Sequence, residues 1–105
     1  MIALRYYENI ILDKNIKSIE TLLKSRIARL DYYAVCVSDI GNGIMEIISL
    51  SNALKSVNAY KNYGIVAIIK GKLAAENMSA KLIEDWLKNN ENLKEFKEYY
   101  NSKCK

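Results

Sequence analysis

Few side chains in this sequence could carry out catalysis, because the 105 residues include no histidine. The chain therefore lacks the commonest general base, histidine-activated nucleophiles and the ligand of most zinc sites. Two carboxylates remain as candidates for enzyme chemistry: Glu46, a charge inside an apolar stretch, and Asp39 in the turn before it. Neither carboxylate is paired in the sequence with a second group in a way that would indicate catalysis. We predict no catalytic, metal-binding or cofactor-binding residues, and we keep Glu46 as the candidate site carboxylate.

Three lysines are candidates for contact with an anion or a nucleic acid: Lys70, Lys72 and Lys81. The first two flank Gly71 immediately before a predicted helix, and the N-terminus of a helix attracts anions. The spacing is not that of a P-loop, because the glycine spacing and the Gly-Lys-Ser/Thr ending are missing.

Tyrosine is the most unusual component of the sequence, with eight residues, several of them in adjacent pairs. Neighbouring side chains point to different faces of a strand and diverge on a helix, so one of each pair is expected to be exposed. Exposed tyrosines favour protein interfaces. The candidate interaction surface consists of Tyr60, Tyr63, Tyr99 and Tyr100.

The composition is typical of a small cytoplasmic protein from an AT-rich bacterial genome, with 13 lysines to 3 arginines. The net charge of +4 is spread along the chain, so no segment forms a basic arm. The N-terminus lacks a signal-peptide pattern, and no apolar run is long enough for a membrane helix. Cys36 lies within an apolar strand and Cys104 near the end, and two unpaired thiols fit a reducing compartment.

The clearest structural pattern runs from Gly64 to Lys88. Five consecutive apolar residues at 65–69 predict a buried strand, and Gly71 then separates it from an amphipathic helix. The apolar stripe of this helix follows the three-and-four spacing of a helical face and consists of Ala75, Met78, Leu82 and Trp86, with Leu87 beside it. We expect the helix to cover the strand.

The middle of the chain predicts a β-hairpin, with strands at 32–37 and 44–50. The residues between them have turn chemistry, including two glycines. A symmetric turn would place Cys36 opposite Glu46.

Helices are predicted on either side of this hairpin. Residues 14–30 have helical spacing with Asp13 as the N-cap, and residues 51–62 form a shorter helix capped by Ser51 or Asn52. A short strand at 2–6 and a last short helix after Asn92 complete the pattern.

This order predicts an α+β two-layer sandwich, with a small mixed or antiparallel sheet of three or four strands and helices packed on it. The elements read (β)αββαβαα, which matches the split βαβ unit of ferredoxin-like folds. Without the first strand and the middle helix, the alternative order is αβββα. We predict one domain over residues 1–101 and a disordered tail at 102–105.

The start of the long helix reads Lys72-x-x-Ala75-x-Asn77-x-x-Ala80-Lys81 and resembles the last helix of double-stranded-RNA-binding domains. The resemblance covers about ten residues and implies the αβββα order and RNA binding through the lysines. The chain departs from the family at Leu73 and Glu76, where lysines are expected, and in having no histidine for the hairpin loop.

The favoured interpretation is a non-enzymatic protein-interaction module that forms a homodimer or binds another protein, with no cofactor and no membrane association. The two nearly continuous apolar strands indicate a sheet that is covered on both faces, and a second copy could supply part of that cover. The alternative is a nucleic-acid-binding domain.

Overall fold

The computed structural model describes residues 4–14, 16–24, 31–38, 43–55 and 62–104. The elements, in chain order, are β1 (Arg5–Leu12), α1 (Ile19–Lys24), β2 (Tyr32–Ser38), β3 (Glu46–Ser49), α2 (Leu50–Lys55), β4 (Tyr63–Lys70), α3 (Lys72–Asn89) and α4 (Phe96–Ser102). This order confirms the βαββαβαα prediction and excludes the αβββα alternative. Strand β1 lies further along the chain than the predicted strand at 2–6, and α1 begins at Ile19 rather than at residue 14. Residues 25–30 and 56–61 of the two helices predicted at 14–30 and 51–62 lie outside the described residues.

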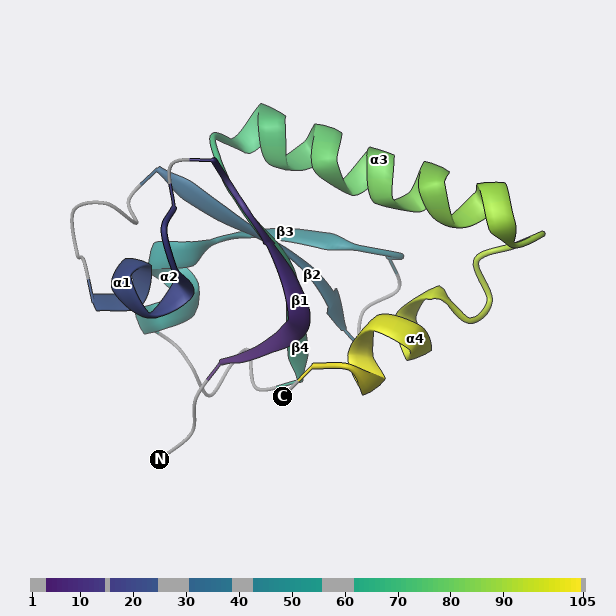
Figure 1. The fold of residues 1–105 in the computed structure, drawn as a ribbon, viewed down its shortest axis with the longest axis horizontal. Coiled ribbons are helices and arrows are strands. Elements are labelled where there is room, and N and C mark those ends of the chain that lie inside the picture. Colours follow the sequence, from purple (N-terminus) through teal and green to yellow (C-terminus); the bar gives the residue numbers. More distant parts are fainter. Residues whose placement is uncertain (1–3, 15, 25–30, 39–42, 56–61, 105) are drawn as a thin grey trace.

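The four strands form one mixed sheet in the spatial order β1-β4-β2-β3, shown in Figure 1. Strand β1 is parallel to β4, whereas β2 is antiparallel to both of its neighbours, β4 and β3. The predicted α+β class is confirmed. The spatial order differs from that of a ferredoxin-like sheet, in which the first strand is central, because β1 lies here at an edge.

The register of the hairpin was predicted correctly, since Cys36 pairs with Glu46 across β2 and β3. A register shift interrupts the β2–β4 pairing: Val35 pairs with Ala67, but Cys36 pairs with Ile65. Val66 is the extra residue of this bulge, and it faces the same core as Ala67. An unbroken apolar run therefore suits β4, which is central in the sheet and buried on both faces.

Helices pack on both faces of the sheet, so the arrangement has three layers rather than the predicted two (Figure 1). One core lies under α1 and α2 and contains Ile19, Leu22, Tyr32, Ala34, Cys36, Leu50, Ile65 and Ile68. The other lies under α3 and α4 and contains Val35, Val37, Val66, Ala67, Ile69, Ala75, Leu82 and Phe96. The chain itself thus covers both faces of β2 and β4, so cover from a second copy is not needed there.

Helices α1 and α2 are capped by Ser18 and Ser49, which are not the predicted N-cap residues. Ser18 Oγ accepts the backbone N–H three residues later at 3.2 Å, so Ser18 and not Asp13 caps α1. The Ser49 Oγ accepts the backbone N–H of Asn52 at 3.4 Å, which places the cap of α2 before Ser51. The Asp13 carboxylate instead accepts the N–H at the end of β4, at 3.1 Å, and so joins the ends of two adjacent strands.

The C-terminal segment returns to the outer edge of β1. Tyr7 and Cys104 form an antiparallel bridge. The Arg5 guanidinium donates to the backbone and side-chain oxygens of Asn101, at 2.9 and 2.8 Å. Segments almost a chain length apart are therefore hydrogen-bonded, and the edge of β1 is partly covered.

Cys104 is packed against the sheet. Residues 102–105 are predicted to form a disordered tail, but Ser102 ends α4 and Cys104 is only 9% exposed; Lys105 lies outside the described residues. A Cβ at Gly64 would lie 2.5 Å from the Cys104 Sγ, so the missing side chain of this glycine makes room for the thiol. Burial raises the pKa of the Cys104 thiol.

Candidate functional site

Aromatic rings gather where the end of α3 meets α4. The ring of Trp86 contacts Phe96 and Tyr99, with centroids 5.5 and 5.4 Å apart. Tyr100 continues the cluster toward the sheet and contacts the Tyr7 ring of β1 at 5.2 Å. Phe96 is fully buried, whereas Tyr99 is 41% exposed, so the cluster extends from the core to the surface.

The loop between α3 and α4 is fixed around the indole of Trp86 by hydrogen bonds. The indole N–H donates to the backbone oxygen of Asn92 at 2.9 Å, and the Asn90 side-chain amide donates to the backbone oxygen of Trp86 at 3.0 Å. The Asn92 side chain in turn accepts the N–H of Lys94 at 2.9 Å. These bonds hold the indole in one orientation, so its surroundings are preorganised.

Three pockets of about 340, 370 and 440 Å³ surround Trp86, which lines all of them. We refer to them together as the α3–α4 hollow, which is lined by the end of α3, by residues 89–95 and by the outer side of α4. Besides Trp86, the first and second pockets share Glu95, the second and third share Tyr99, and the first and third share Asn89. The three pockets are therefore neighbouring surface depressions around one side chain.

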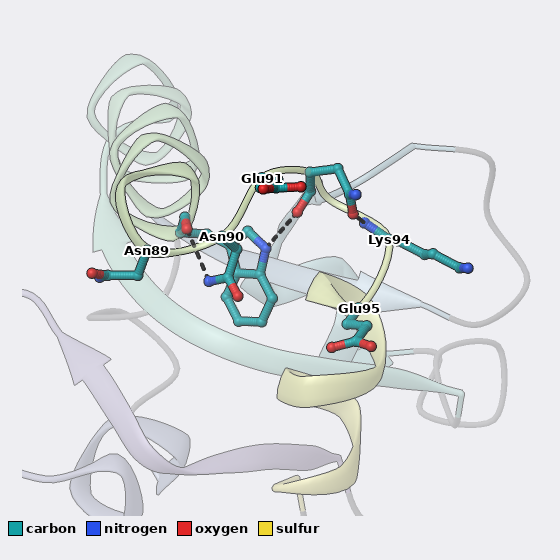
Figure 2. Close-up of a pocket in the computed structure, with 7 residues that line it drawn as sticks. Asn89, Asn90, Glu91, Lys94 and Glu95 are labelled. Carbon is teal, nitrogen blue, oxygen red and sulfur yellow. Dashed lines mark hydrogen bonds between the residues drawn. The ribbon is translucent and has the colours of Figure 1, made fainter.

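The α3–α4 hollow is acidic, although the chain as a whole is basic. Its lining includes four carboxylates and one ammonium group, a formal charge of −3, on a chain with a net charge of +4. The carboxylates belong to Asp85, Glu91, Glu95 and Glu98, and the ammonium group to Lys94. In Figure 2, Glu95 extends beside the start of α4.

The tyrosines of the hollow add no charge at neutral pH. A hydrogen bond with Tyr7 raises the pKa of Tyr99, and burial raises the pKa of Tyr100. Both phenols therefore stay protonated under physiological conditions, and the charge of the hollow comes from its carboxylates.

A second exposed feature is the outward face of α3. Leu73 is 72% exposed and Leu87 is 44% exposed, and Ala80, midway between them, is also exposed. Residues seven apart lie almost on one line along a helix, so these three form an apolar stripe, the α3 outer stripe. Leu87 was expected beside the buried stripe, but a rotation of about 100° per residue turns it away from Leu82 and Ala75.

The predicted tyrosine surface is only partly brought together. Tyr99 and Tyr100 lie side by side in the α3–α4 hollow, with ring centroids 5.1 Å apart. Tyr63 is half-buried and packs against the other core, under α1 and α2. Tyr60 lies outside the described residues.

The three candidate lysines are exposed but are not arranged on one face. Lys72 and Lys81 are nine residues apart on α3, which is two and a half turns, so they project to opposite sides of the helix. Lys70 ends β4. A basic surface that binds the phosphates of a nucleic acid would need these lysines on one face of the molecule.

Glu46 lies in the edge strand β3, away from the α3–α4 hollow. Its Oε2 is buried and has no hydrogen-bond partner among the described residues. Burial, and then the charge of Glu46, raise the pKa of the neighbouring Cys36 thiol, which stays protonated and therefore unreactive. Asp39 lies outside the described residues.

Sequence reasoning missed the α3–α4 loop as part of a site. Residues 89–92 read as the end of a helix, and their polar character is typical of any exposed connection. The available signal was Trp86, the only tryptophan of the chain, which directly follows two acidic residues, Glu84 and Asp85. Tryptophan is enriched in the cores of binding surfaces.

No helix in the described parts of the chain is both long and apolar enough to cross a membrane. Among the same residues, no group of three or more cysteine, aspartate or glutamate side chains is placed to hold a metal ion. Comparison with known protein families, with curated proteins and with solved structures found no match to this chain.

Proposed function

We propose that this chain is a non-enzymatic protein-interaction module of the cytoplasm that self-associates through the α3 outer stripe. The observation that carries the proposal is the exposure of Leu73 and Leu87 on one line of the same helix. Leu73 and Leu87 are two of the three large apolar side chains that are exposed among the described residues. Burying exposed leucine side chains is favourable by roughly 25 cal/mol per Å².

The spacing of the stripe suits a symmetric pair of helices. Ala80 is equally distant in sequence from Leu73 and Leu87. A two-fold axis near Ala80 would bring two antiparallel copies of α3 together, with Leu73 of each copy against Leu87 of the other. The small alanine side chain at the centre would allow the helices to approach closely.

Size-exclusion chromatography with light scattering tests this proposal, with absorbance recorded at 260 and 280 nm. We expect a dimer near twice 12.0 kDa with a protein-like absorbance ratio. Leu73→Glu should shift the protein to monomer, since the change occurs twice in a symmetric dimer. Ala74→Glu is the matched control, because Ala74 is exposed on α3 but lies off the stripe.

Three results would contradict the proposal: a monomer at all concentrations, a dimer that tolerates Leu73→Glu, or a dimer that Ala74→Glu disrupts equally. Far-ultraviolet circular dichroism establishes that each variant is folded. A nucleic-acid-like absorbance ratio that disappears in high salt would instead favour the nucleic-acid-binding alternative.

A further inference from the structure

The α3–α4 hollow concentrates negative charge on an otherwise basic molecule. Its formal charge is −3 on a chain of net charge +4, so the remainder carries a surplus of seven positive charges. The negative hollow attracts a cationic ligand, whereas the positive charge of the remaining surface repels it. The charge pattern thus identifies both the sign of the ligand and the surface that it meets.

The aromatic rings of the hollow suit the same kind of ligand. Trp86 and Tyr99 present ring surfaces to the pockets, and the faces of aromatic rings attract ammonium and guanidinium groups. The chain itself shows this attraction, because the Lys103 Nζ lies 5.2 Å from the centre of the Tyr99 ring. The carboxylates and the rings are therefore two independent features that favour a cation.

The arrangement of the carboxylates fits a peptide better than a single small cation. Glu95 and Glu98 are three residues apart at the start of α4, so they lie on one side of the helix. Asp85 belongs to α3, where it also pairs with Lys88 at 3.5 Å, and Glu91 belongs to the loop. The negative groups are thus distributed along the hollow, as successive side chains of an extended segment would require.

We propose that the α3–α4 hollow binds a cationic segment of a partner protein, with lysine or arginine side chains packed on Trp86 and Tyr99 and paired with the surrounding carboxylates. This surface is separate from the α3 outer stripe, so the inference does not depend on self-association. The preorganised loop favours binding without a large rearrangement of the hollow.

Tryptophan fluorescence provides a direct test, because the only tryptophan lies in the hollow. The full chain is titrated with acetylated, amidated tetra-arginine, and separately with tetra-glutamate and with a neutral Gly-Ser peptide of equal length. We expect a saturable change in emission with tetra-arginine alone. The apparent dissociation constant should increase with salt, since the contacts are partly exposed.

The double variant Glu95→Gln and Glu98→Gln keeps the shape of the hollow and removes two charges. We expect it to weaken tetra-arginine binding about tenfold, from roughly threefold for each of the two exposed pairs. Glu20→Gln is the matched control, because Glu20 is exposed on α1, a helix that packs on the opposite face of the sheet. It should leave the dissociation constant unchanged.

The proposal is overturned if tetra-arginine produces no saturable change on the folded protein, or if the neutral or acidic peptide binds equally well. Equal weakening by Glu20→Gln and by the double variant would also overturn it, since attraction would then be general and not local. The oligomeric state, measured by light scattering on the same samples, reports separately on the α3 outer stripe. Failure of either proposal is therefore distinguishable from failure of the other.

Discussion

The close packing of Cys104 against Gly64 predicts how much the substitution Gly64→Ala destabilises the fold. In Gly64→Ala the new Cβ would lie 2.5 Å from the Cys104 Sγ and 3.2 Å from its Cβ. Carbon–sulfur contacts need about 1 Å more, so the thiol must move. It cannot move freely, since it also donates to the Tyr100 oxygen at 3.2 Å and its backbone bridges to Tyr7.

Overpacking of this kind costs about 1–3 kcal/mol, and the ordinary gain from replacing a strand glycine by alanine offsets roughly 0.5–1 kcal/mol of that. We therefore expect Gly64→Ala to lower the free energy of unfolding by about 1–2 kcal/mol, which is a decrease in Tm of roughly 4–16 °C for a domain of this size. Urea unfolding followed by Trp86 fluorescence measures the change.

A double-mutant cycle with Cys104→Ala isolates the contact. In that background the sulfur is absent, and the remaining 3.2 Å contact with the Cβ of residue 104 opposes the ordinary gain from a strand alanine. Gly64→Ala should then be nearly neutral, and the coupling energy should be about 1–2 kcal/mol. Gly43→Ala is the control, because among the described residues a Cβ there would meet only the Met45 backbone oxygen, at an ordinary 3.5 Å. Equal destabilisation by Gly64→Ala in both backgrounds would refute the packing of Cys104 against Gly64.

Three further predictions concern stability. Gly71→Ala should cost about 1–3 kcal/mol in urea unfolding, because Gly71 has a φ of 88° with open space around it, so the cost is conformational. Phe96→Ala should cost about 3–5 kcal/mol because the ring is fully buried, whereas Tyr99→Ala should cost much less; similar values would contradict the burial pattern. Folding raises the pKa of both Cys36 and Cys104 above the ordinary thiol value of 9.0, so the protonated thiols favour the native state. The contribution of these thiols to stability should be fully present below about pH 8 and decrease as the pH rises through 9 and beyond, and a urea midpoint that is unchanged from pH 8 to pH 10.5 would contradict this.

Local patterns in the sequence predicted the elements well, and for a physical reason. The apolar run of β4 and the three-and-four spacing of α3 depend on the burial of these segments themselves, so composition reveals them. The Cys36–Glu46 register followed from a short turn between adjacent strands, because loop length fixes the pairing of a hairpin.

The features that the sequence did not predict depend on distant parts of the chain. Nothing local indicates that β1 pairs with β4 rather than with β2, or that the C-terminal segment returns to β1. The exposure of Leu87 depends on which side of α3 meets the sheet. The α3–α4 hollow exists only because the loop folds around Trp86, a result of side-chain hydrogen bonds that no spacing rule encodes.

The position of β1 has a consequence for the order of folding. This strand is bonded on one side to β4 and on the other to the C-terminal segment, where the Glu8 N–H donates to the Lys103 oxygen at 3.0 Å. Both partners are more than fifty residues away in sequence, so each contact must close a long loop before it contributes any stability. The β2–β3 hairpin and its junction with β4 can form earlier, at much shorter separations. We therefore expect the first segment of the chain to join the sheet last and to leave it first in partial unfolding.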